Sequence, residues 1–371
     1  MSERDLRYWI GFNKVSGIGA TRLRALLDHF GDLELAWQAS AHDLHNAGLD
    51  QRSLENLLHA RRELDLDREV ERMQRARVQV LTWEDADYPR NLREIYNAPP
   101  VLFVRGKIEK LDEWAVAVVG TRQASVYGKE AARMIGTGLA QAGVTVVSGL
   151  ALGIDTVAHR TCLDAGGRTI AVLGCGVDTV YPPQNAHLAA EIVERGALLS
   201  EFALGTRPEA RNFPPRNRII SGLTLGTVVV EADLGSGARI TADFAAEQGR
   251  DVFAVPGNVF ARGCRGTNRL IQEGAKLVCA VADILEELNL TMVSEQAQVR
   301  AVLPENQTEA TLLAQLSAEP RHVDDLGRAV GLPIAQVSST LALMELKGMI
   351  RQVGGMSYVL AREGRGEYVI E

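Results

Sequence analysis

The first residues that could bind a ligand form a short turn after an apolar run. Residues 115–119 are small or β-branched, and Gly120, Thr121, Arg122 and then Ser125 follow them. An uninterrupted apolar run of this kind is typical of a strand buried on both faces, and Ser125 is a good N-cap for the helical spacing that follows. A helix N-terminus offers free N–H groups and the positive end of a dipole, and Arg122 adds a permanent cation. This turn is therefore expected to bind an anion, most simply a phosphate.

The stretch 211–222 is the richest in groups that suit nucleic acid. Its side chains of interest are Arg211, Phe213, Arg216, Asn217 and Arg218, and no acidic residue interrupts them. Arginines beside an asparagine and an aromatic ring suit a surface that follows a phosphate backbone and stacks bases. At least one of the arginines is expected instead to form a structural ion pair with Glu201 or Glu231.

Two further strand ends carry glycine and hydroxyl residues. These residues are Ser148 and Gly149 after one apolar run, and Gly237, Arg239 and Thr241 after another. The carboxyl ends of parallel strands meet at one edge of a sheet, so several anion-binding turns are expected side by side. A row of such turns suits a polyanion better than a single mononucleotide.

No motif points to a metal, a cofactor or covalent catalysis. The 4 cysteines are scattered without a CxxC pair, so buried thiols are expected rather than a zinc site or disulfides. Asp155 and His159 share a helix face but have no evident third partner, and structural roles are expected for both. The phosphate-loop pattern GxxxxGK[ST] is absent, and spacing assigns no Ser–His–Asp or Cys–His arrangement. We therefore expect no cofactor and no metal.

Composition limits the partners and the location. The chain has 371 residues, 46% hydrophobic and 23% charged, which is ordinary for a globular protein of two or three domains. Its net charge is −7, so binding to nucleic acid would need a local basic patch. No apolar run approaches the roughly 18 residues of a transmembrane helix, and the N-terminus has no signal-peptide core. We expect a cytoplasmic protein with no membrane partner.

The order of the apolar runs predicts the architecture. Runs recur with gaps that could hold helices, at 115–119, 144–147, 169–173, 197–199, 227–230 and 252–255. Such alternation predicts an α/β fold with a Rossmann-like, doubly wound and mainly parallel sheet. We assign this domain to residues 81–288, with a leading segment 81–113.

Smaller units are predicted on either side of the sheet. Residues 1–80 are expected to be a helical domain of the SAM or helix-hairpin-helix type, and the glycine-punctuated turn at 15–23 could contact a DNA phosphate or simply join two packed helices. Residues 289–308 are polar and are assigned as a linker. Residues 309–371 fit a winged helix. Residues 311–360 hold 4 basic and 4 acidic side chains, so a protein-contact or packing role is favoured over duplex binding.

Six ordered motifs within 114–285 resemble the DNA-processing DprA family, also called Smf. They are GTRQAS-x-YG, SGLALGID-x-x-AH, TIAVLGCGVD-x-x-YP, FPPRNRIISG, EA-x-x-x-SGARITA and VFAVPG. The resemblance implies a Rossmann-like core between helical N-terminal and winged-helix C-terminal domains. It also implies a non-enzymatic protein that binds single-stranded DNA during natural transformation, protects the incoming strand, helps load the recombinase RecA, and dimerises through the Rossmann-like domain.

The same resemblance implies roles for individual residues. Arg122 corresponds to an arginine that grips a DNA phosphate, and the resemblance adds contacts from Ser125, Ser148, Gly149, Arg216, Asn217 and Arg218. Together with the residues argued from their chemistry above, the full set expected at the DNA is Gly120, Thr121, Arg122, Ser125, Ser148, Gly149, Arg211, Phe213, Arg216, Asn217, Arg218, Gly237, Arg239 and Thr241. Ile271 and Leu277 are expected at the dimer interface. Two positions depart from the family pattern, because Leu152 replaces a usual arginine and Pro183 lies near an often basic position. The absence of basic side chains at these two positions could weaken DNA binding or shift it toward Arg239.

Two alternatives stay open at this point. The core also resembles nucleotide-processing Rossmann proteins of the lysine-decarboxylase-like group, in which a PGGxGT turn and a nearby glutamate act on a nucleoside monophosphate. Residues 235–241 with Glu231 partly match that arrangement. The other alternative is a regulator that binds duplex DNA through the winged helix. The third helix of that unit argues against it, because it carries no basic residue before Lys347.

Overall fold

The structure, a computed structural model, divides into two compact units, residues 1–291 and 292–371. The residues that it describes are 3–290, 306–317, 320–346 and 349–360. Most of the linker expected at 289–308 therefore lies outside the described residues. A separate domain boundary near residue 80 stays a prediction, because residues 1–291 form one unit.

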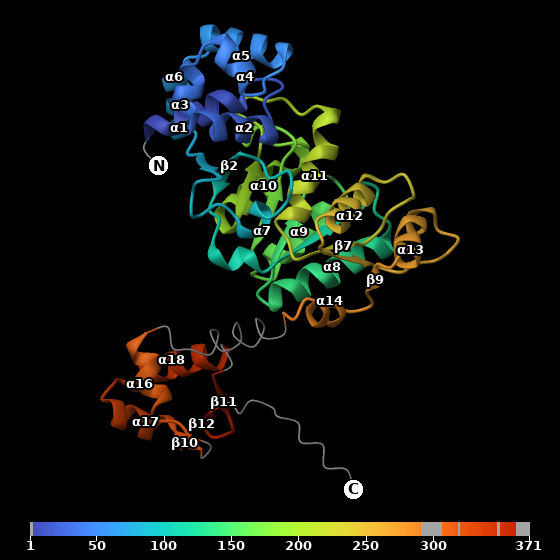
Figure 1. Ribbon diagram of the computed structural model, residues 1–371. Helices are drawn as coiled ribbons and strands as arrows, with labels where there is room; N and C mark the ends of the chain where they lie inside the picture. Colours follow the sequence, from blue (N-terminus) through green and yellow to red (C-terminus); the bar gives the residue numbers. More distant parts are fainter. Residues whose placement is uncertain (1–2, 291–305, 318–319, 347–348, 361–371) are drawn as a thin grey trace. The chain divides into compact units, whose positions relative to one another are not determined.

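A nine-stranded sheet runs through the first unit, in the order β1-β2-β6-β5-β4-β3-β7-β8-β9. Figure 1 labels β2, β7 and β9 of this sheet. The strands are β1 Gln79–Thr82, β2 Val101–Gly106, β3 Ala115–Val119, β4 Thr145–Ser148, β5 Thr169–Val172, β6 Ala197–Ser200, β7 Gly226–Val229, β8 Asp251–Ala254 and β9 Lys276–Leu277. Every neighbouring pair from β3 to β9 is parallel, whereas β1 and β2 join antiparallel. The predicted doubly wound, mainly parallel sheet is confirmed, and β1 is an additional strand that the sequence did not predict.

Helices cover both faces of the sheet. One layer contains α8 Val126–Gln141, α9 Ile154–Asp164, α10 Ala186–Arg195 and α14 Val281–Glu287, and the other contains α7 Arg90–Arg93, α11 Phe213–Gly222 and α12 Gly237–Glu247. Side chains alternate between the faces of a strand, and Ala115, Ala117 and Val119 of β3 share a core with apolar residues of α11 and α12. The helix α13 Arg265–Gln272 follows β8.

Six short helices precede the sheet. They are α1 Glu3–Asn13, α2 Ala20–Phe30, α3 Leu33–Gln38, α4 Ala41–Asn46, α5 Gln51–Glu63 and α6 Leu66–Arg75. Their core contains an edge-to-face contact between Phe12 and Trp37, with ring centroids 5.1 Å apart, and it also includes Phe103 of β2 and Leu204 after β6. The helical prediction for this region is confirmed, and these helices share buried surface with one edge of the sheet.

The second unit has the predicted composition of a winged helix. Its helices are α16 Gln307–Leu313, α17 Val323–Val330 and α18 Ile334–Leu346, and its three strands are β10 Arg321–His322, β11 Ile350–Gln352 and β12 Ser357–Leu360. Leu326, Val337 and Leu341 are fully buried between the helices. None of the described helices is both long and apolar enough to span a bilayer.

The sheet order reverses at β3, because β4 lies on one side of it and β7 on the other. Ligands of open α/β sheets bind at such a reversal. The loops after β3 and β4 approach each other closely here: the Ile154 N–H donates to the Thr121 carbonyl at 3.2 Å. Gly153 has a φ of +84°, and a Cβ on it would lie 2.3 Å from the Thr121 oxygen. Only glycine fits this position.

We expect Gly153→Ala to lower the free energy of unfolding more than Gly166→Ala. Both glycines have positive φ, which costs a side chain about 1–2 kcal/mol, but a Cβ at Gly166 would meet no atom within 4 Å. The clash with the Thr121 carbonyl should add at least about 1 kcal/mol at Gly153. Urea unfolding of the two variants measures the difference, and equal losses would contradict this account of the loop contact.

Candidate nucleic-acid interface

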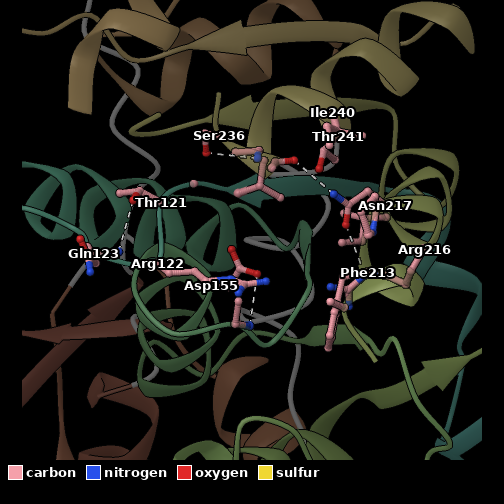
Figure 2. A pocket seen from close by; sticks show the side chains of 18 residues that line it. Thr121, Arg122, Gln123, Asp155, Phe213, Arg216, Asn217, Ser236, Ile240 and Thr241 are labelled. Atoms are coloured by element: carbon pink, nitrogen blue, oxygen red, sulfur yellow. Dashed lines mark hydrogen bonds between the residues drawn. The ribbon is translucent and has the colours of Figure 1, made fainter. Parts of the chain in front are cut away.

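A cavity of about 420 Å³ opens at the carboxyl ends of β3, β4 and β7 (Figure 2). We call it the cradle. Its wall comes from the loop after β3 and from the starts of α9, α11 and α12, and it includes Gly120, Thr121, Arg122, Gln123, Asp155, Phe213, Arg216, Asn217, Ser236, Gly237 and Thr241. The structure thus brings together predicted residues from three motifs that lie far apart in the chain.

Arg122 is the exposed cation of the cradle. Figure 2 shows its side chain reaching from the loop after β3 toward Phe213, and the guanidinium carbon lies 5.8 Å from the centre of that ring. No carboxylate among the described residues pairs with it. An exposed arginine held against an aromatic face keeps its N–H donors free for an anion.

The helix that follows begins as predicted. The Ser125 Oγ accepts a hydrogen bond from the Gly128 N–H at 3.0 Å, so Ser125 is the N-cap of α8. The Ser125 N–H donates to Oε2 of Glu231 at 2.9 Å. Ser125 is exposed but does not line the cradle, because these bonds keep it at the helix start.

Arg216 requires a correction, because it lies in the floor of the cradle with almost no exposed surface. Its side chain is buried, and Nη1 donates to the carbonyls of Gly149, at 3.1 Å, and Val172. Burial lowers the pKa of its guanidinium to about 10, and the nearby Asp155 carboxylate opposes that shift. Arg216 is therefore still a cation at neutral pH, but it cannot follow a DNA backbone.

The Arg218 side chain also forms its hydrogen bonds within the protein. Its Nη1 and Nη2 each donate to a different carboxylate oxygen of Glu201 at 2.7 Å, and its Nε donates to the Asn97 carbonyl. The expectation that one arginine of this stretch pairs with Glu201 is confirmed. A direct role for Arg218 at the DNA is corrected, because a bidentate pair with little exposure leaves few donors free.

Ser148 and Gly149 are further corrections. The Ser148 hydroxyl is buried and donates to the Val118 carbonyl at 2.7 Å, and the Gly149 N–H donates to Oδ2 of Asp155 at 3.1 Å. Neither donor is available to a phosphate. Their function is to hold the loop after β4 in place under the cradle.

Asp155 and His159 have the structural roles expected of them. Asp155 accepts the N–H groups of Gly149 and Ala151, and burial raises the pKa of its carboxyl group against the effect of Arg216. His159 is bonded through Nδ1 to the Thr169 hydroxyl at 2.6 Å. Burial lowers the pKa of His159 to about 3, so its ring is neutral.

The start of α12 forms the facing wall of the cradle. Ser236 is its N-cap and accepts from the Ala238 N–H at 3.3 Å, and the Asn217 side chain donates to the Gly237 carbonyl at 3.2 Å. Thr241 lines the wall one turn further on. Nothing lies within 4 Å of a Cβ placed on Gly237, so a ligand can approach the backbone there.

Two other arginines lie away from the cradle. Arg239 pairs with Glu273 at 3.0 Å and is not among the residues that line the cavity, so the expected shift of binding toward it stays a prediction. Arg211 is exposed and pairs with Glu209 at 2.8 Å. Leu152 and Pro183, at the two departures from the family pattern, are exposed and supply no charge.

Sequence reasoning missed three residues at this site. Gln123 and Ser236 line the cradle, and both lie inside motifs that the sequence already offered. The position of Ser236 just before a helix marked by Gly237 was a usable capping signal. Tyr181, whose ring centre lies 5.6 Å from that of Phe213, is half exposed. Nothing in the local sequence indicates this contact, because the two rings lie on separate crossovers.

Glu231 does not reach the cradle. It is buried, and a Cβ at Gly128 would lie 2.0 Å from its Oε2 while one at Gly263 would lie 2.5 Å from its Oε1. Packed between these two glycines, the carboxylate cannot contact a nucleotide in the cavity, which removes the main support for the enzymatic alternative. Within the described residues, no group of three or more His, Cys, Asp or Glu side chains could hold a metal ion.

We expect Arg216→Met to lower the free energy of unfolding by about 3–5 kcal/mol, because it leaves Asp155 as a buried charge without its cation. The matched change Arg122→Met should alter stability by less than about 0.5 kcal/mol, since that side chain is exposed. Urea unfolding at neutral pH compares the two. Similar losses of stability in both variants would contradict the assignment of Arg216 as the buried arginine and Arg122 as the exposed one.

The comparisons with known proteins agree with this geometry. Residues 79–289 match the family model of DNA recombination-mediator protein A, and residues 296–356 match that of the DprA winged helix domain. Protein Smf of Synechocystis is 35% identical, over 96% of this chain and 99% of its own length. DNA processing protein DprA of Streptococcus pneumoniae is 46% identical, over 55% of this chain and 72% of its own.

Two solved structures share the fold. The crystal structure of S. pneumoniae DprA aligns with a TM-score of 0.68 at 36% identity, covering 76% of this chain and 97% of that one. Helicobacter pylori DprA, described for its single-stranded DNA binding mode, aligns with a TM-score of 0.52 at 29% identity, covering 57% and 95%. With a Rossmann-like core, a winged helix and two family models in chain order, the protein belongs to the DNA recombination-mediator protein A family, DprA or Smf.

Proposed function

We propose that this protein binds single-stranded DNA with a phosphate in the cradle, and that it acts as a recombination mediator. The observation that carries the proposal is Arg122, an exposed cation without an acidic partner at the point where the sheet order reverses. The H. pylori relative, described for binding single-stranded DNA, supports the same ligand class.

The proposed binding mode uses three kinds of contact. Arg122 holds a phosphate together with the N–H groups at the start of α12, near Ser236 and Gly237. Phe213 and Tyr181 offer ring faces for bases, which are accessible in a single strand but stacked inside a duplex. The buried charge of Arg216 offsets that of Asp155 beneath the cradle, so the phosphate meets a net positive site.

We expect Arg122→Ala to weaken binding of a labelled oligothymidylate by about 1–3 kcal/mol, the range for a hydrogen bond to a charged group. The slope of log affinity against log salt should fall by about one, since one phosphate contact is lost. Fluorescence anisotropy at several salt concentrations measures both quantities, and competition with duplex DNA tests the preference for single strands.

Arg133→Ala is the matched control, because Arg133 is exposed on α8, pairs with Glu130 and does not line the cradle. It should leave binding unchanged. A chain that lacks residues 309–371 should also bind normally, since we assign the winged helix, whose α18 exposes Ile334 and Leu343, to a protein contact. Equal losses for Arg122→Ala and Arg133→Ala would reject the cradle as the DNA site.

The recombination role requires delivery of the strand to RecA, and we propose that a homodimer carries it out. We assign the dimer contact to α13 and β9. β9 is the last strand of the sheet and Leu277 on it is 43% exposed, while Ile271 on α13 is partly buried. An edge strand with an exposed leucine is a surface that a second copy can cover.

Leu277→Glu should convert a dimer into a monomer, because it places a charge in an apolar contact. Light scattering after size-exclusion chromatography measures the mass. The control is Leu35→Glu, since Leu35 is similarly exposed, at 57%, on α3. A dimer that persists in Leu277→Glu would move the interface elsewhere.

A further inference from the structure

A second groove lies on the other side of the segment that bounds the cradle. The segment consists of the 3₁₀ turn Ala210–Asn212 and the first turns of α11. Phe213 and Pro214 face the cradle, whereas Arg211 and Pro215 face a cavity of about 540 Å³ between this segment and the N-terminal helices. One short stretch of chain is therefore the common wall of two cavities.

The lining of the second groove suits nucleotides. Phe202 and Phe244 are half-buried and present apolar surface, and Arg211 lies at the rim with an exposed side chain. The side chain of its partner Glu209 is 48% exposed, and an exposed pair of this kind contributes little to stability, so a phosphate could replace the glutamate. Deeper in the groove, Arg218 and Glu201 neutralise each other. The result is a rim with one exposed arginine, held only by a surface ion pair, above an aromatic interior.

Two glycines in the turn before α2 differ in the space around them. Gly17 is required by the fold, since its φ is +93° and a Cβ would lie 2.6 Å from the Ser53 hydroxyl. Gly19 lines the groove and has an ordinary φ of −98°, and nothing lies within 4 Å of a Cβ placed there. Neither backbone conformation nor packing requires glycine at position 19. The missing side chain leaves space in the groove.

We infer that a bound single strand continues from the cradle across the common wall into this second groove, so that the N-terminal helices form part of the DNA site. The inference rests on the proposed function. A volume of about 540 Å³ is within the range of sites that hold small ligands, and it suits a short stretch of nucleotides rather than a duplex. The glycine-punctuated turn then acts as a wall of a single-strand groove.

The test compares Gly19→Asp with Gly19→Asn over a length series of oligothymidylates. Gly19 is the N-cap of α2, and Asp and Asn are equally good N-caps, so both variants should fold. They differ by one negative charge in the groove. The shortest oligonucleotides that bind should bind both variants as they bind the wild type. For longer ones, Gly19→Asp should bind about fivefold more weakly than Gly19→Asn at low salt, and high salt should reduce the difference.

Each outcome decides the inference. Equal affinities of the two variants at every length would overturn it, because the added charge would then be far from any phosphate. An equal loss at all lengths would also overturn it, since the charge would be acting on the cradle. If the wild type binds no oligothymidylate of any length, the proposed function fails first and the inference fails with it.

Discussion

The site depends on a cation that is almost completely buried. Arg216 extends from α11 under the sheet edge and donates to carbonyls after β4 and at the end of β5. Asp155 is close by on α9 and holds the same loop through the N–H groups of Gly149 and Ala151. Burying either charge alone would be costly, so each requires the other. Together they fix the loop whose close approach to Thr121 gives the cradle its shape.

Because of this arrangement, few cations remain for the ligand. The chain carries a net charge of −7, and of the three arginines within 211–218 one is buried and one is held by Glu201. In the proposed binding mode, attraction to a polyanion then falls mainly to Arg122 in the cradle and Arg211 at the rim of the groove. Ring faces and backbone N–H groups must supply much of the remaining affinity, which is the type of binding that favours an unstacked single strand over a duplex.

The sequence predicted the strands well and the directions of side chains poorly. Apolar runs located β3 to β8 within about one residue, because a strand buried on both faces must be apolar throughout. Ser125 was identifiable because capping is a local interaction. The partners of Ser148, Gly149 and Glu231 come from other strands, and no local pattern reveals them. β1 was missed for a similar reason, since its pairing with β2 and not its own composition makes it a strand.

The arginine-rich stretch 211–218 shows why the directions of its side chains could not be predicted from the sequence. The same helical geometry explains why this stretch also lines the second groove. Its three arginines were all placed in the set expected at the DNA, and at least one of them was also expected to form an ion pair, but the sequence did not show which one. In a helix, residues three apart share a face, so Phe213 and Arg216 turn toward the cradle while Pro215 and Arg218 turn toward the groove. A helix exposed on two sides in this way serves both cavities. A DNA strand bound as we propose would pass over the first turn of α11, with Phe213 on one side and Arg211 on the other. Helix α11 would then join the two sites.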